Sequence, residues 1–88
     1  MKGWSVYILR CCDDTLYTGI AVDLAKRLDA HRRGAAAKYT RSRRPVTLAY
    51  EEFQPDRSSA QKREAEVRRL GRAGKLALID TFATLRAP

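Results

Sequence analysis

Several features that assign a chain to a common class of protein are missing from these 88 residues. The only cysteines, Cys11 and Cys12, are adjacent, and neighbours in a strand point to opposite faces, so no stabilising disulfide is expected between them. With only one histidine in addition, zinc sites of the CxxC and HExxH types are excluded. No apolar run approaches the ~18 residues of a membrane span, and the first residues lack a signal-peptide core. We therefore expect a cytoplasmic protein without membrane association.

Common hydrolytic motifs are absent as well. The sequence has no Ser-His-Asp signature, no Walker A motif and no pair of catalytic carboxylates. Internal repeats and low-complexity linkers are also missing, and a chain of this length can bury one small core between two packed layers. We expect a single domain over residues 1–88.

Basic residues are abundant and concentrated. Eighteen Lys and Arg against ten Asp and Glu give a formal net charge of +8. Residues 21–50 hold eight of these cations against only Asp23 and Asp29, which is a net +6. Thirteen of the eighteen are Arg, whose planar guanidinium matches the geometry of phosphate. A focused basic surface of this kind is typical of proteins that bind nucleic acid.

The hydrophobic pattern predicts an α+β fold, a three-stranded antiparallel sheet flanked by helices in the order β-β-α-β-α-α. Residues 4–11 are apolar at both odd and even positions, which indicates a central strand covered on both faces. Residues 15–20 form the second strand of a hairpin. Asp23 is expected to cap the first helix, which ends at Gly34.

The second half of the chain completes this fold. A basic loop over residues 34–45 leads to a third strand over residues 46–53. A capping box, Ser58-x-x-Gln61, is expected to open a second helix that runs to about residue 70. Apolar spacing over residues 72–85 predicts a third helix.

Both of the first two predicted helices carry charged or polar residues on a packing face. In the first, one stripe contains Leu24, Arg27, Leu28 and His31. In the second, the stripe contains Ala60, Arg63, Glu64 and Val67. Arg27 and His31 can be structural there, the former by extending along the apolar face. A carboxylate among packing residues must pair with an Arg or bind a cation, so Glu64 is the best metal-ligand candidate, with a structural ion pair as the alternative.

Together these residues resemble the GIY-YIG nuclease domain, especially its small stand-alone bacterial members, the YhbQ-like group. The resemblance covers about residues 4–80. Its matching segments, in chain order, are Ser5-Val6-Tyr7, Tyr17-Thr18-Gly19, Arg27-Leu28-x-x-His31, Ala37-Lys38-Tyr39-Thr40-Arg41 and Arg63-Glu64-Ala65-Glu66.

The resemblance implies a phosphodiesterase that uses one divalent metal ion, magnesium or manganese. It implies that Glu64 holds the ion and that Arg27 clamps the scissile phosphate. Tyr17 would activate or position the attacking water, with Tyr7 and His31 beside it in the same cleft. Ser5, Thr18, Ile20 and His31 depart from residues common in the family, and the general base stays open between Tyr17 and His31. Gly19 would be structural, next to the site.

The implied function is a metal-dependent endonuclease acting on DNA, selective for structure rather than sequence, because the small group lacks additional recognition domains. RNA is the other possible nucleic acid, and no protein partner is identified. The alternatives are a nucleic-acid-binding module of the same fold without turnover and an adaptor in a DNA repair complex. The residues expected to bind nucleic acid are Arg32, Arg33, Lys38, Arg41, Arg43 and Arg44.

A shared site for Tyr7 and Tyr17 also constrains the hairpin. A plain two-residue turn at Asp13-Asp14 would pair Arg10 with Tyr17 and direct Tyr7 to the other face. We therefore predict an odd loop of three or five residues, or a bulge.

Overall fold

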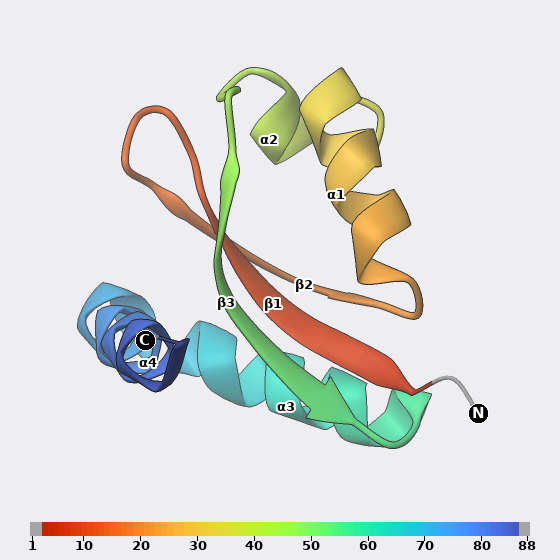
Figure 1. Cartoon of the computed structure of the whole chain (residues 1–88), viewed down its shortest axis with the longest axis vertical. Coiled ribbons are helices and arrows are strands. Elements are labelled where there is room, and N and C mark those ends of the chain that lie inside the picture. Colours follow the sequence, from red (N-terminus) through yellow and green to blue (C-terminus); the bar gives the residue numbers. More distant parts are fainter. Residues whose placement is uncertain (1–2, 87–88) are drawn as a thin grey trace.

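The computed structural model describes residues 3–86 and shows a three-stranded sheet with helices on both faces (Figure 1). Residues 1–2 and 87–88 of the expected domain lie outside the described residues. The elements are β1 (Trp4–Arg10), β2 (Leu16–Ala21), α1 (Leu24–Arg33), α2 (Lys38–Arg41), β3 (Thr47–Gln54), α3 (Arg57–Arg69) and α4 (Gly71–Arg86). The predicted class and the order of strands and main helices are confirmed. The basic loop additionally contains the one-turn helix α2, which the sequence did not predict.

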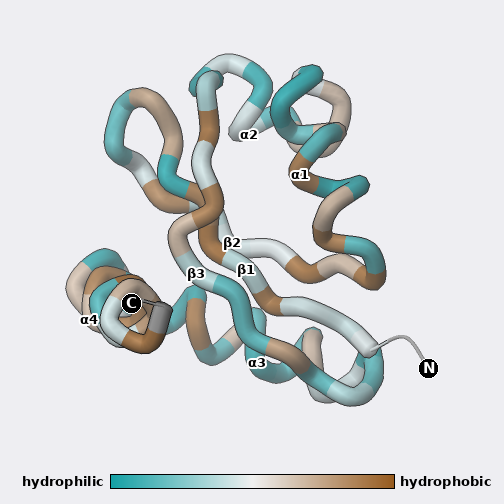
Figure 2. The backbone as a smooth tube through the Cα atoms, viewed as in Figure 1, coloured by the Kyte–Doolittle hydropathy of each residue, from teal (hydrophilic) through white to brown (hydrophobic). Residues whose placement is uncertain are grey.

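Strand β1 lies at the centre of the sheet, in the order β2-β1-β3 with both pairings antiparallel. Its even-numbered side chains, Val6 and Ile8, belong to a core shared with α3 and α4. Its odd-numbered side chains, Tyr7 and Leu9, belong to a second core that includes residues of α1. Figure 1 shows α3 and α4 on one side of the sheet and α1 and α2 on the other. In Figure 2 α3 is mostly hydrophilic in colour, which agrees with its burying only Ala60 and Val67. The predicted double coverage of β1 is confirmed.

The hairpin joining β1 and β2 has a three-residue loop. The Cys11 amide donates to the Thr15 carbonyl at 2.9 Å, which leaves residues 12–14 in the loop, with Asp14 in the left-handed region at φ 68°. The register sets Leu9 opposite Tyr17, so Tyr17 lies on the face that carries Tyr7. The predicted odd loop and the shared face are both confirmed.

Helix α1 begins and ends where the sequence indicates. The Asp23 carboxylate accepts a hydrogen bond from the Lys26 amide at 3.1 Å, which satisfies one of the free amides of the first turn. Gly34 ends the helix with φ 80°, a conformation that favours glycine, and its amide bonds to carbonyls of the last turn. These two ends fix the helix from which Arg27 and His31 extend on successive turns.

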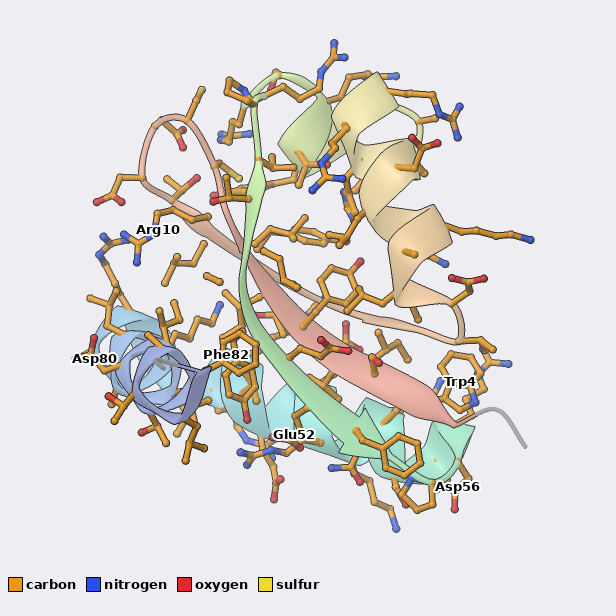
Figure 3. The ribbon with its side chains drawn as sticks, viewed as in Figure 1. Trp4, Arg10, Glu52, Asp56, Asp80 and Phe82 are labelled. Carbon is orange, nitrogen blue, oxygen red and sulfur yellow. The ribbon has the colours of Figure 1, made fainter. Side chains whose placement is uncertain are left out.

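Helix α3 begins earlier than the capping box predicts. Its N-cap is Asp56, whose carboxylate accepts from the Ser59 amide at 2.8 Å (Figure 3). The predicted capping box of Ser58 and Gln61 is therefore wrong. Both residues lie inside the helix, because Asp56, two positions before Ser58, already satisfies the free amide.

Two contacts hold the α3–α4 pair against the sheet. Glu52 of β3 accepts hydrogen bonds from Arg63 of α3, with the closest distance 2.9 Å, and Phe82 of α4 packs edge-on against Tyr50 of β3 (Figure 3). Within residues 3–86, no helix combines the length and the apolar character that crossing a membrane requires.

The start of α3 provides a stability test. We expect Asp56→Ala to lower the free energy of unfolding by about 1 kcal/mol, because it removes the N-cap. Ser58→Ala, the matched control at the sequence-predicted cap, should change it by less than about 0.5 kcal/mol, since this position is an exposed helical residue. Urea unfolding of the two variants checks both values. A larger loss for Ser58→Ala would show that Ser58, and not Asp56, caps the helix.

Candidate active site

Tyr7 is at the centre of the candidate site, and Gly19 makes room for it. The register places the two residues opposite each other on β1 and β2. A methyl group added to Gly19 would lie 2.6 Å from the Tyr7 hydroxyl oxygen and 2.7 Å from its ring carbon Cζ. The absence of a side chain at Gly19 therefore lets the Tyr7 ring lie across β2, where it is completely buried.

His31 of α1 is also completely buried, and both of its ring nitrogens have partners. Nε2 lies 2.9 Å from the Tyr7 hydroxyl, and Nδ1 lies 2.8 Å from the Thr40 hydroxyl. The Thr40 hydroxyl donates its single proton to the Ala37 carbonyl at 3.2 Å, so it accepts a hydrogen bond from Nδ1–H. It follows that Nε2 carries no proton and that the Tyr7 hydroxyl donates to it.

Arg27, one turn before His31, brings positive charge to this buried pair. Burial lowers the pKa of His31, and the charge of Arg27 lowers it further. Burial also raises the pKa of Tyr7 to about 12, with a contribution from Tyr17, while the Arg27 guanidinium opposes the rise. Arg27 itself is exposed. Its guanidinium is thus available to an anionic ligand next to two neutral, buried groups.

Glu64 approaches the same place from α3. Its side chain is 21% exposed, its carboxylate lies 3.0 Å from Nη2 of Arg68, and its charge contributes to the raised pKa of Tyr7. The sequence placed Glu64 among packing residues, and the structure gives it a half-buried position with one face accessible. The structure therefore brings Tyr7, Arg27 and His31 together from β1 and α1, and the charge of Glu64 on α3 acts on the same tyrosine.

The structural ion pair that was the alternative role for Glu64 is made by the residue before it. Arg63 bonds to Glu52 across the β3–α3 interface, and both side chains are mostly covered. Glu64 instead pairs with Arg68 along one helix, and the Arg68 side chain is 57% exposed. A half-exposed pair between residues four apart contributes little to stability, so Glu64 can exchange its partner for another cation.

The donor set fits magnesium or manganese better than zinc. Residues 3–86 contain no cluster of three or more His, Cys, Asp or Glu side chains that could surround a metal ion. Mg²⁺ typically binds one or two carboxylates and completes its shell with water and substrate phosphate. The partly exposed carboxylate of Glu64 matches that mode, whereas structural zinc would require four protein ligands.

Tyr17 borders the buried pair and is itself partly exposed. Its ring lies 5.3 Å from the His31 ring and 6.5 Å from the Tyr7 ring, measured between centroids. Its hydroxyl makes no hydrogen bond with the described residues. On its other side it stacks on Tyr39 of α2, with centroids 5.9 Å apart and planes 26° apart. Tyr17 is thus positioned by ring contacts alone.

The six residues predicted to bind nucleic acid differ in how free they are. Arg43 bonds to Asp13 at 3.1 Å and lies 4.0 Å over the Tyr39 ring, and Arg44 donates to the carbonyls of residues 41 and 32. Arg33 pairs with Asp29 at 2.9 Å. The side chains without a hydrogen bond or ion pair to the described residues are those of Arg32, Lys38 and Arg41.

Sequence reasoning assigned no role to Thr40 or Tyr39, although both lie in a segment that supports the resemblance. A buried histidine requires a hydrogen-bond partner for each ring nitrogen, so a predicted buried His31 implied that a partner such as Thr40 exists. Nothing in the spacing of residues 31 and 40 could identify that partner, because the end of α1 and a turn separate His31 from α2, which contains Thr40.

Comparisons with known proteins agree with this geometry. The family model described as GIY-YIG catalytic domain matches residues 3–77. UPF0213 protein SA0446 of Staphylococcus aureus is 50% identical over 79 residues, which are 90% of this chain and 96% of that protein. UPF0213 protein DP2720 of Desulfotalea psychrophila is 49% identical over 77 residues, 86% of this chain and 70% of that protein.

A solved structure supports the same assignment. The solution NMR structure of the UPF0213 protein BH0048 from Bacillus halodurans is 38% identical in sequence and has a TM-score of 0.58. The match covers 92% of this chain and 85% of that one. The fold, the family match over residues 3–77 and the constellation around Tyr7 lead to one conclusion: this chain belongs to the GIY-YIG catalytic domain family of nucleases.

Proposed function

We propose that this chain is a cytoplasmic, metal-dependent endonuclease that hydrolyses phosphodiester bonds in DNA. The observation that carries the proposal is the convergence on Tyr7. Its hydroxyl bonds to His31, and the charges of Arg27 and Glu64 both act on its pKa. An exposed cation and an exchangeable carboxylate beside buried neutral groups are the elements that phosphodiester hydrolysis requires.

In this proposal Arg27 binds the scissile phosphate. The guanidinium can donate two parallel hydrogen bonds to phosphate oxygens and stabilise the negative charge that grows in the transition state. Glu64 would hold one Mg²⁺ or Mn²⁺, which when bound supplies further positive charge at that phosphate. The Tyr7–His31 pair stays neutral and fixes the ring positions around the reacting groups.

We assign the general base to Tyr17. The sequence left this role open between Tyr17 and His31. His31 is completely buried and both of its nitrogens are engaged, so it has no direct access to an attacking water. Tyr17 is partly exposed, its hydroxyl makes no hydrogen bond with the described residues, and its ring lies beside that of Tyr7. Geometry thus supports Tyr17 as the group that takes the proton from water.

The unpaired cations of α2 are suited to binding the phosphate backbone of a nucleic-acid substrate. Lys38 and Arg41 lie on either side of Tyr39 and Thr40, which contact the site. Contacts to phosphate position a strand without reading its bases, so we propose selection by DNA structure, such as branches or nicks, in a process like DNA repair. Cleavage assays on both DNA and RNA decide which nucleic acid is the substrate.

One observation favours a second candidate, a nucleic-acid-binding module without turnover. The Arg68 guanidinium already neutralises Glu64 at 3.0 Å. If no metal ion displaced Arg68, the basic surface would still bind DNA and no cleavage would follow. Variants of Glu64 separate the two candidates.

We expect Glu64→Gln to reduce cleavage at least about 100-fold, because it removes the charge that would hold the cation at the transition state. Cleavage is measured with Mn²⁺ on branched, nicked, single-stranded and duplex DNA. Metal-free DNA affinity should stay level or rise slightly, since an anion near the phosphate is lost. The free energy of unfolding should change by at most about 1 kcal/mol, because the Glu64–Arg68 pair is partly exposed.

Glu66→Gln is the matched control for this experiment. It removes the same charge from a 57% exposed carboxylate two residues along α3 and should leave cleavage unchanged. A folded Glu64→Gln protein that binds DNA and cuts at the wild-type rate would exclude Glu64 from the reaction. Wild-type protein that binds but never cuts, with either metal, would establish the binding module instead.

Replacing each tyrosine by phenylalanine should affect a different property of the protein. Tyr17→Phe should lower cleavage about 100- to 10,000-fold through loss of the general base, with little change in stability. Tyr7→Phe should lower the free energy of unfolding by about 1–3 kcal/mol, because it leaves buried Nε2 of His31 without a donor. Single-turnover cleavage and thermal unfolding of both variants test this, and wild-type cleavage by Tyr17→Phe would exclude Tyr17 as the general base.

The basic surface is tested by the salt dependence of binding. We expect Lys38→Gln/Arg41→Gln to reduce the slope of log affinity against log salt by about 1.8 for duplex DNA, about 0.9 for each lost phosphate contact. The control Lys62→Gln/Arg69→Gln removes one Lys and one Arg from exposed positions of α3 and should leave the slope unchanged. Equal slopes for the two double variants would place the binding surface elsewhere.

A further inference from the structure

A second group of polar side chains lies beside the proposed site, along the free edge of β2. They border a groove of about 270 Å³. The lining residues come from β2, α2, α3 and α4 and are Leu16, Tyr17, Thr18, Tyr39, Arg68 and Lys75. The basic segment of residues 21–50 does not include the cations of this groove, Arg68 and Lys75.

The groove contains more positive charge than its surroundings neutralise. Arg68 of α3 divides its donors between Glu64, at 3.0 Å, and the Thr18 carbonyl, at 3.2 Å. Lys75 of α4 is only partly exposed and makes no hydrogen bond or ion pair with the described residues. Burial lowers the pKa of Lys75, and the charge of Arg68 lowers it further. Of these two neighbouring cations only Arg68 is paired with a carboxylate, so the charge of Lys75 is left without an anion.

Thr18 adds an independent observation. Its side-chain hydroxyl is buried, with the residue 3% exposed, and it has no hydrogen-bond partner. Among residues 3–86 it is the one buried side-chain oxygen or nitrogen in that condition. Buried hydroxyls in folded proteins are normally paired, so the unpaired hydroxyl of Thr18, a residue that lines the groove, is a candidate donor to a ligand oxygen.

The remaining wall of the groove is aromatic. Tyr17 and Tyr39 stack on each other, and Tyr39 remains 38% exposed. Cations that follow a backbone together with aromatic side chains are the usual composition of a site for a nucleic-acid strand. Because Tyr17 belongs to both the groove and the proposed active site, a strand held here continues directly from the scissile position.

We propose that Arg68, Lys75 and Thr18 bind a second phosphate of the substrate strand, next to the one that Arg27 clamps. The proposal rests on the proposed function, since it assumes a nucleic-acid substrate. Lys75 supplies the uncompensated charge, Arg68 turns part of its guanidinium from Glu64 to the phosphate, and the Thr18 hydroxyl bonds a phosphate oxygen. The groove thereby fixes the direction in which the strand crosses the site.

Lys75→Met tests the proposal, because methionine retains most of the side-chain length and removes the charge. Binding of a labelled single strand and a labelled duplex is measured against salt concentration in EDTA, so neither metal nor cleavage affects the result. We expect the slope of log affinity against log salt to fall by about 0.7 for the single strand and about 0.9 for the duplex. Lys75→Arg should retain the wild-type slope.

Lys62→Met is the matched control, an exposed lysine of α3, and should behave as wild type. Thermal unfolding accompanies each isotherm, and Lys75→Met should melt at or above the wild-type temperature, because it removes an unpaired, partly buried cation. If Lys75→Met did not fold, Arg68→Gln would decide by the same loss of slope.

A wild-type slope for folded Lys75→Met, or for Arg68→Gln in its place, would overturn the second phosphate site. Cleavage and the Glu64 variants would then still stand, so the proposed function would survive. Wild-type protein that bound neither oligonucleotide would overturn both proposals.

Discussion

The hydrogen bond between the Tyr7 hydroxyl and Nε2 of His31 is the contact on which the rest of the site depends. It lies inside the fold, so the ring of Tyr7 needs room, which the missing side chain at Gly19 provides. The second nitrogen of His31 needs a hydrogen-bond partner, which is the Thr40 hydroxyl. Thr40 in turn bonds to the Ala37 carbonyl and thereby holds the first turn of α2. One chain of satisfied groups thus connects the central strand to the basic segment.

This chain explains why a short, polar helix sits at a defined place. Four residues are too few for a stable helix in isolation, and α2 contains just four. Other elements set its position: Thr40 bonds to His31, and Tyr39 stacks on Tyr17 and has the Arg43 guanidinium over its ring. The charged ends of α2 are therefore presented next to the buried pair by contacts of their uncharged neighbours.

Much of the fold could be predicted because it follows from periodicity and local chemistry. The apolar pattern of both faces placed β1 in the centre, and the requirement that Tyr7 and Tyr17 share a face fixed the parity of the hairpin loop. Asp23 and Gly34 marked the ends of α1. The start of α3 was mistaken because Asp56 and Ser58 are both good caps in sequence, and only the backbone conformation decides between them.

The site was predictable to the extent that a residue's position on a helix implies burial. That argument selected His31 and Glu64, but it could not separate the pairs made by consecutive residues of α3. Arg63 extends to Glu52 and fastens the helix to the sheet, while Glu64 pairs with Arg68, which also bonds to the Thr18 carbonyl of β2. The partners lie on different elements, so the distinction exists only in three dimensions.

The distribution of charge along the sequence was a poor guide to which cations are free to bind phosphate. Three of the six basic residues predicted to bind phosphate have internal partners, and Arg43 and Arg44 mainly organise the segment that carries α2. Conversely, Lys75 lies outside the basic segment of residues 21–50 and has no partner among the described residues, in a groove shared with Arg68. Whether a cation can serve a ligand depends on what already neutralises it, and a count along the chain cannot contain that information. A cation is available to a substrate only where folding leaves it unpaired, as it leaves Lys75 in the groove that Tyr17 also lines.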